Sequence, residues 1–114
     1  MREARTLKLS LAGRKPAEAV LRAAIQGKRC IRALYNRNQI LLAPYVLYSK
    51  HGDPFVDGVV LERDGNPPRE LKLGVFKVIG LKDLASTSIG FRIEPLFDRA
   101  AAHYESDCFM AAPD

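Results

Sequence analysis

Residues 29–81, RCIRALYNRNQILLAPYVLYSKHGDPFVDGVVLERDGNPPRELKLGVFKVIGL, decide the fold. Turn-forming residues at 36–38, 51–54 and 64–68 divide this stretch into four apolar runs. Short strands joined by tight turns at such close spacing are typical of antiparallel sheets that curl or close on themselves. The stretch therefore predicts a mainly β fold, a small antiparallel barrel or curled sheet.

Five strands are expected, at 29–36, 39–50, 54–63, 69–76 and 77–81. Pro44 lies inside the second of them and cannot donate a ladder hydrogen bond, so it marks an edge position or a bulge that bends the strand. Gly58, inside the third strand, is a place where a barrel strand can curve sharply. Bent strands interrupted by proline and glycine favour closure into a barrel over a flat sheet.

Weaker patterns flank the predicted barrel. Residues 6–11 alternate apolar and polar, which predicts either an added edge strand or an arm that docks only on a partner. A helix is expected over 16–26, stopped by Gly27 and covering one open end of the barrel. The region 97–105 predicts a short helix, and 108–114 a loosely held tail.

We therefore expect one domain in three parts. Residues 1–15 form a basic arm or extra strand, 16–84 the helix and barrel, and 85–114 a C-terminal extension of the same domain. The length of 114 residues, with 47% hydrophobic and 27% charged residues, is ordinary for one globular domain. No apolar run approaches the ~20 residues of a membrane span, and the basic N-terminus lacks the apolar core of a secretory signal. A cytoplasmic protein that does not bind membranes is expected.

The cysteines and histidines predict neither a metal site nor a cofactor. Cys30 and Cys108 lie far apart, and His51 and His103 are the only histidines, so no zinc-binding set can be written. Cys30 falls inside a strand pattern, where a thiol usually behaves as a small buried hydrophobe. A disulfide is not expected in a reducing compartment.

Charge is distributed unevenly along the chain. Residues 1–50 carry eleven Lys and Arg against two acidic residues, a net charge of +9, whereas residues 51–114 carry a net charge of −4. One-sided charge of this kind favours an anionic partner, above all nucleic acid or a nucleotide. The alternative is a solvated surface whose two halves attract each other.

The order of a helix, AIQGKRCIRALYN, LLAPYVLYSKHGDPFVDG and RELKLGVFKVIGL resembles a WYL domain over residues 17–98. The resemblance implies an Sm-like or SH3-like barrel that senses ligands, binds nucleic acid or nucleotide-type ligands, and regulates transcription or phage defence. The family's Trp-Tyr-Leu signature falls on 54–56, where Phe55 keeps the aromatic position. Its closing Phe-Arg-Leu-Asp-Arg motif falls on 71–75, where Lys72 keeps the first charge without arginine's planar fork. No helix-turn-helix segment precedes the barrel, so a separate DNA-binding or effector protein is an expected partner.

A barrel that binds nucleic acid needs cations for phosphates and exposed aromatic rings for bases. Lys72 is selected by both pattern and resemblance. Alternation along the second strand places Tyr45 and Tyr48 on opposite faces, so one of these tyrosines is expected to face solvent. The competing interpretation is packing, which is the commoner role of strand tyrosines and of a phenylalanine such as Phe55. The candidate ligand-binding residues are Arg32, Tyr35, Tyr48, Lys50, Phe55, Arg69 and Lys72.

No catalytic residues are predicted. His51 beside Asp53 is an acid–base pair without a nucleophile motif, and no P-loop or HExxH motif occurs. Asp53 and Asp57 would lie roughly 13 Å apart along a strand, which suits a turn or surface better than a carboxylate pair. The expected function is a non-enzymatic regulatory module. Its alternative is a protein-interaction module that forms homo-oligomers through open strand edges and binds no nucleic acid.

Overall fold

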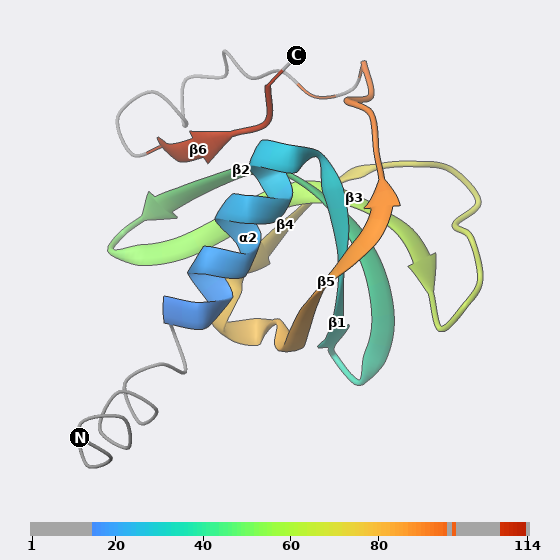
Figure 1. Cartoon of the computed structure of the whole chain (residues 1–114). Helices are drawn as coiled ribbons and strands as arrows, with labels where there is room; N and C mark the ends of the chain where they lie inside the picture. The colour runs from blue at the N-terminus through green and yellow to red at the C-terminus, as the bar shows by residue number, and fades with distance from the viewer. Residues whose placement is uncertain (1–14, 96, 98–107, 114) are drawn as a thin grey trace.

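The computed structural model describes residues 15–95, 97 and 108–113 (Figure 1). The arm predicted at 6–11 and the helix predicted at 97–105 lie, apart from residue 97, outside these described residues. Along the chain the elements are α2 (Lys15–Gly27), β1 (Arg29–Tyr35), β2 (Asn38–Lys50), β3 (Asp53–Arg63), β4 (Leu73–Lys77), the 3-10 helix η1 (Val78–Gly80), β5 (Lys82–Gly90) and β6 (Cys108–Ala111).

The strands form one antiparallel sheet in the order β4-β3-β2-β1-β5, with β6 added beside β2. The prediction of a mainly β, antiparallel fold is confirmed. Closure into a barrel is not found, because within the described residues β4 pairs only with β3, and β5 only with β1. Even so, β4 and β5 are the two ends of the strand order and only residues 78–81 join them. A flat sheet would separate them by about 19 Å, so the sheet must be curled.

The curl begins in β2, whose 13 residues change partner halfway. Its first part pairs with β1 up to Leu42, and its second part pairs with β6 from Val46 onward. Against β3, Pro44 stands opposite Gly58 and Val46 opposite Asp57, so Tyr45 is an extra, unopposed residue. Of the two roles predicted for Pro44, an edge position or a bulge, the structure shows a bulge next to it, where the strand exchanges one neighbour for another.

Gly58 allows a close approach of two strands at this bend. A Cβ atom added to Gly58 would overlap the carbonyl oxygen of Ala43 and lie 3.1 Å from the Cα of Pro44. In the next strand Gly74 stands opposite Gly58, and a Cβ there would lie 2.9 Å from Cε1 of Phe76. The row Pro44–Gly58–Gly74 thus crosses the sheet without bulky side chains, which lets β2 and β3 bend together.

Helix α2 lies across one face of the curled sheet (Figure 1). Its buried residues Leu21, Ala24 and Ile25 pack against a core that includes Ile31 and Leu42. Its observed bounds agree with the predicted helix to one residue at each end, but Lys28, not Gly27, takes the left-handed conformation at the helix end, with φ 53°. No helix among the described residues is long and apolar enough to cross a membrane.

The opposite face of the sheet is covered by the segment that follows β5. Phe91, Ile93 and Phe97 pack over a second apolar cluster made by Cys30, Leu41, Ala43, Tyr45 and Val59. Cys30 is fully buried, as predicted, and burial raises the pKa of its thiol. The sheet is therefore sandwiched between α2 on one side and Phe91, Ile93 and Phe97 on the other.

Three sequence predictions about the later elements were wrong. The fourth strand, expected over 69–76, begins only at Leu73, because residues 67–72 belong to the loop that follows the turn at Asp64-Gly65. Residues 77–81 are not a fifth strand: Val78 and Leu81 are both buried three positions apart, a spacing that a 3-10 turn satisfies and a strand does not. The fifth strand is β5, mostly exposed and rich in Ser and Thr, so it shows no apolar alternation. The expected loose tail is β6, anchored to β2 by a hydrogen bond of 2.7 Å from the Ala112 N–H to the Tyr45 carbonyl oxygen.

Candidate functional site

A groove of about 440 Å³ lies between the end of β3, the β3–β4 loop and β4. We call it the β3–β4 groove. It contains Lys72, the residue that the sequence selected most strongly, together with a second cation, Arg63. The groove is lined by Val60, Arg63, Asn66, Pro67, Pro68, Glu70, Lys72, Gly74 and Phe76.

The wall formed by Arg63 and Asn66 is built by a tight turn. Asp64 and Gly65 have φ values of 51° and 83°, and Arg63 and Asn66 exchange backbone hydrogen bonds of 2.8 and 3.0 Å. Two positive φ values in succession are what a two-residue hairpin turn requires. Asp64 also ties the turn to β2, because its Oδ1 accepts the Gln39 N–H at 2.9 Å and its own N–H donates to the Gln39 carbonyl at 2.7 Å. The position of Arg63 is thus fixed by backbone contacts.

The floor of the groove is the ring of Phe76, which is only 6% exposed. The ring fits closely over Gly74 and contacts Tyr35 edge-on, with ring centroids 5.0 Å apart. Tyr35 is half-buried and so supports the floor instead of offering an open stacking surface. The buried ring of Phe76 and the two cations give the groove both an apolar and a positively charged part.

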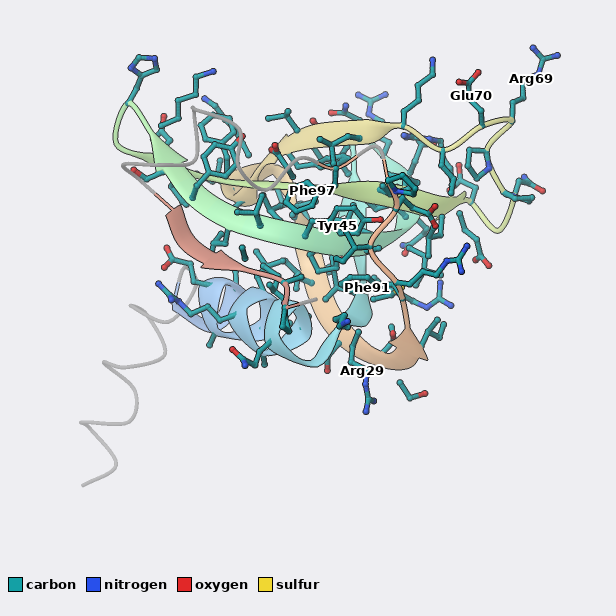
Figure 2. All side chains as sticks on the ribbon, turned by 90° about the horizontal axis from the view of Figure 1, so that it is seen from above. Arg29, Tyr45, Arg69, Glu70, Phe91 and Phe97 are labelled. Atoms are coloured by element: carbon teal, nitrogen blue, oxygen red, sulfur yellow. The ribbon has the colours of Figure 1, made fainter. Side chains whose placement is uncertain are left out.

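The charged side chains of the groove are open to solvent. Arg63, Glu70 and Lys72 are all exposed, and among the described residues neither Arg63 nor Lys72 forms an ion pair. Their charges are therefore available to an incoming anion. Figure 2 shows Arg69 and Glu70 projecting outward from the β3–β4 loop, well away from Arg29.

The remaining candidate residues do not gather at this groove. Arg32 is exposed on β1, where it pairs with Leu41 and Ala85 near the middle of the sheet. Lys50 is exposed at the far end of β2, next to the β2–β3 turn. Phe55 is half-buried at the start of β3, with the ammonium of Lys77 6.0 Å from its ring centroid. The predicted set is therefore divided among separate places on the sheet.

Tyr48 does not offer a ring to a ligand in this structure. Its side chain is 2% exposed, its ring stacks on Phe55 with centroids 6.0 Å apart, and its hydroxyl donates a hydrogen bond of 2.7 Å to Oδ1 of Asp57. Burial and the neighbouring Asp57 carboxylate raise the pKa of Tyr48. The surface or turn position expected for Asp57 was also wrong, because that side chain is 1% exposed.

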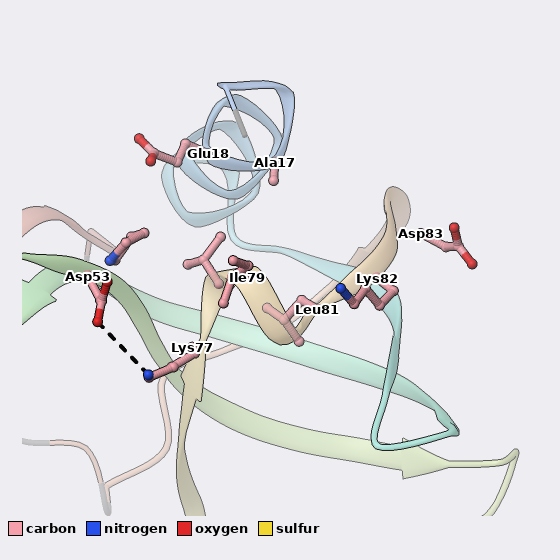
Figure 3. A pocket seen from close by; sticks show the side chains of 10 residues that line it. Ala17, Glu18, Asp53, Lys77, Ile79, Leu81, Lys82 and Asp83 are labelled. Atoms are coloured by element: carbon pink, nitrogen blue, oxygen red, sulfur yellow. Dashed lines mark ion pairs between the residues drawn. The ribbon is translucent and has the colours of Figure 1, made fainter. Parts of the chain in front are cut away.

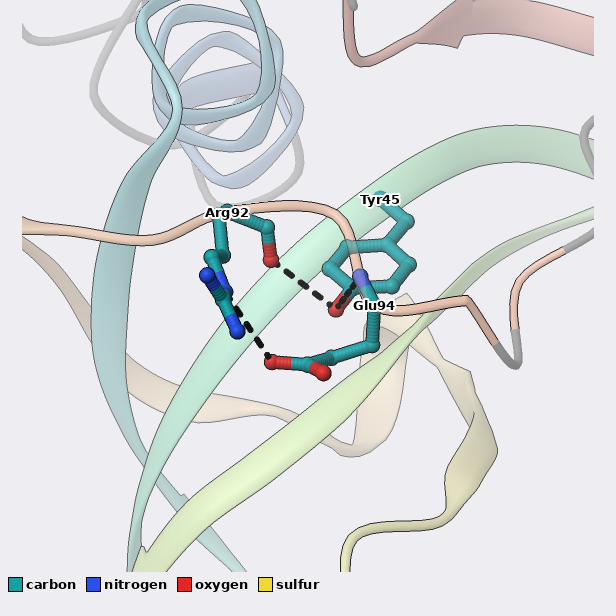
Figure 4. Close-up of polar contacts among 3 residues, drawn as sticks. All are labelled: Tyr45, Arg92 and Glu94. Atoms are coloured by element: carbon teal, nitrogen blue, oxygen red, sulfur yellow. Dashed lines mark hydrogen bonds and ion pairs between the residues drawn. The ribbon is translucent and has the colours of Figure 1, made fainter.

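The expectation that Tyr45 and Tyr48 lie on opposite faces, with one of them in solvent, was wrong because the bulge at Tyr45 reverses the alternation of β2. Ile40, Leu42 and Leu47 pack in the core beneath α2, whereas Tyr45 and Tyr48 both lie in clusters that Phe97 covers. Tyr45 is 1% exposed and packs between Phe91 and Phe97, with ring centroids at 5.6 and 5.0 Å. Its hydroxyl donates to the Arg92 carbonyl at 3.3 Å and accepts the Glu94 N–H at 3.0 Å (Figure 4). Tyr45 therefore holds the covering segment in place, and burial raises the pKa of its phenol.

Sequence reasoning missed Arg63 as a member of the site. The sequence feature that could have identified Arg63 is the Asp64-Gly65 pair. A two-residue hairpin turn at this pair brings the residues on either side of it together, and so places Arg63 against the loop that follows the turn. Among the described residues, no group of three or more His, Cys, Asp or Glu side chains is placed to hold a metal ion.

Comparisons with known proteins found no match to this chain among protein-family models, curated proteins or solved structures.

Proposed function

We propose that this chain is a non-enzymatic regulatory module that binds an anionic ligand, nucleic acid or nucleotide, in the β3–β4 groove. The observation that supports it is that two exposed cations, Arg63 and Lys72, line one groove together with the buried ring of Phe76. Cations contribute affinity for phosphate, and the apolar floor suits the edge of a base or sugar.

The same proposal includes the fold family. A WYL-like chain with an Sm-like or SH3-like barrel is supported by the curled sheet, in which η1 joins the two ends of the strand order, β4 and β5. Lys72, the residue carried over from the family's closing motif, stands directly before β4 and lines the groove. Its ammonium acts as a point charge, so Arg63 supplies the guanidinium fork that the motif position lacks.

The test is a fluorescence-polarisation titration of short labelled single-stranded DNA and RNA, and of a labelled mononucleotide, at several salt concentrations. Two phosphate contacts predict that log K falls with log salt with a slope of about −1.4. Arg63→Ala and Lys72→Ala should each weaken binding and make the slope shallower by about 0.7. Lys82→Ala, an exposed lysine on β5 outside the β3–β4 groove, is the matched control and should bind as the wild type does.

Lys50→Ala and Arg32→Ala locate the site if the groove is not where binding occurs. Loss of binding in either of these variants, with Lys72→Ala unaffected, would place the ligand on another part of the sheet and refute the assignment to the groove. Binding that does not change with salt would refute a phosphate ligand.

A second function, homo-oligomerisation through strand edges, is favoured by one observation. Among the described residues β4 and β5 each have one unpaired edge, and each carries an exposed apolar residue, Val75 at 56% and Ile89 at 41%. Open edges of this kind can pair with another chain. Light scattering over a range of protein concentrations tests it: a mass that rises with concentration, with no affinity for nucleic acid, would favour this function over the first.

A further inference from the structure

A second groove, of about 470 Å³, lies between the first turn of α2, the start of β3 and the η1 turn (Figure 3). We call it the α2–η1 groove. It shares no lining residue with the β3–β4 groove, and the inference drawn from it does not depend on the ligand proposed above. It is lined by Ala17, Glu18, Asp53, Pro54, Lys77, Val78, Ile79, Leu81, Lys82 and Asp83.

The groove has an apolar centre. Val78 and Leu81 are buried at 5% exposure each, whereas Ile79, between them in sequence, is 73% exposed, the highest value among the exposed large apolar residues of the described chain. The 3-10 turn causes this arrangement, since it directs positions three apart to the same side and the residue between them away. An isoleucine held out into a groove by a rigid turn is a surface that gains stability when covered.

Charges surround this apolar centre. The carboxylates of Glu18, Asp53 and Asp83 outnumber the ammonium groups of Lys77 and Lys82. Asp53 and Lys77 form an ion pair of 3.9 Å, but both side chains are more than half exposed, so the pair is weak (Figure 3). The groove is thus apolar inside, slightly acidic at its rim, and suited to a basic chain with an apolar face.

The chain itself supplies such a segment next to the groove. Helix α2 begins at Lys15, and Ala17 and Glu18 in its first turn line the groove, so residues 1–14 join the structure at the groove's edge. In that segment Leu7, Leu9 and Leu11 alternate with polar residues, and four Lys or Arg residues stand against one Glu. Residues 12–14, which include Gly13, can span about 10 Å, enough to reverse the chain into the groove.

We propose that residues 6–11 of the same chain occupy the α2–η1 groove as an extended segment. Leu7, Leu9 and Leu11 would face one side, as alternation requires, and cover Ile79. Lys8, the one basic residue of 6–11, would then face the opposite side of the segment, away from Ile79. The predicted N-terminal arm thereby becomes an intramolecular strap that ties α2 to η1.

The first test uses the full chain and thermal unfolding. Ile79→Ser should be nearly neutral if the side chain stays in water, but should lower the melting temperature by about 4 °C if the arm covers it. Leu9→Ser should cause a similar shift, and the double variant no more than the larger single one, because both remove the same contact. Lys8→Ser is the matched control for Leu9→Ser, and Ile89→Ser is the matched control for Ile79→Ser. The melting-temperature shift of Lys8→Ser should add to that of Ile79→Ser, and the shift of Ile89→Ser should add to that of Leu9→Ser.

The second test identifies the occupant by methyl NMR. Nuclear Overhauser effects from the Ile79 methyl groups to leucine methyl groups of the arm, lost in Leu9→Ser, are the expected result. Additive thermal shifts together with no such effects would overturn the proposal. Effects seen only between differently labelled molecules in a mixed sample would also overturn it, because the occupant would then be the arm of a second copy.

Discussion

Replacing Gly58 by alanine should be among the most damaging single-methyl additions in this protein. The new Cβ would overlap the carbonyl oxygen of Ala43 and lie 3.1 Å from the Cα of Pro44, both of which are backbone atoms of β2 at the bulge. A side chain could rotate away, but here the two strands themselves must separate. The substitution therefore acts on the bend that curls the sheet.

The magnitude follows from these contacts. Overpacking of a rigid interior usually costs about 1–3 kcal/mol, and backbone against backbone belongs at the upper end, so we expect a loss of about 3 kcal/mol. A 114-residue domain has a free energy of unfolding of about 6–17 kcal/mol. The variant should thus lose a large part of its stability and melt about 12 °C lower than the wild type.

Urea unfolding followed by circular dichroism measures the change, and Gly90→Ala is the matched control. Gly90 also lies in a strand, but the nearest atom to its added Cβ is the Lys28 carbonyl oxygen at 3.6 Å, an ordinary contact. The control should stay within about 1 kcal/mol of the wild type, or gain slightly from reduced unfolded-state entropy. A Gly58→Ala variant as stable as Gly90→Ala would refute the close approach of β2 and β3.

Three further results are expected. Tyr48→Phe removes the hydrogen bond to the buried Asp57 and should cost about 1.5–3 kcal/mol in urea unfolding, whereas Tyr35→Phe, whose hydroxyl bonds no described residue, should cost less than about 0.5. Burial and Asp57 raise the folded-state pKa of Tyr48 above its unfolded value of about 10. The stability that the protonated Tyr48 gives to the fold is therefore complete below pH 10 and falls as the pH rises beyond it. If the free energy of unfolding changes with pH equally in the wild type and in Tyr48→Phe between pH 9 and 11, this expectation is contradicted. In a Cys108→Ser background, buried Cys30 should react with a thiol reagent at pH 8 far more slowly in the native protein than in urea, and equal rates would show that the thiol is accessible.

The sequence predicted well the features that depend on local stereochemistry. Pro44 cannot donate a ladder bond, so residue type alone limited it to an edge position or a bulge, and the Asp64-Gly65 pair predicted a turn in the same way. The apolar stripe of α2 likewise defined a helix to within a residue. In each case the cause and the effect lie within a few neighbouring residues.

Features that depend on distant contacts were not predictable in this way. The β-branched pair Val78 and Ile79 is typical of a strand, and only the need to join the two ends of the sheet makes it a turn. β6 pairs with β2 across about 60 residues of chain, and the burial of Tyr45 and Tyr48 depends on Phe91, Phe97 and Ala111, which lie far from β2 in the sequence. The candidate site was found only in part for the same reason: Lys72 was identified, but Arg63 joined it through the fold.

The most direct test of the proposed function is amide chemical-shift mapping of the ¹⁵N-labelled protein during titration with a short single-stranded oligonucleotide at low salt. We expect the largest changes at Arg63, Asn66 and residues 72–76, which line the β3–β4 groove or lie beside its lining residues, and we expect added salt to reverse them. Saturating oligonucleotide without any shift, or shifts confined to residues away from the groove, would contradict it.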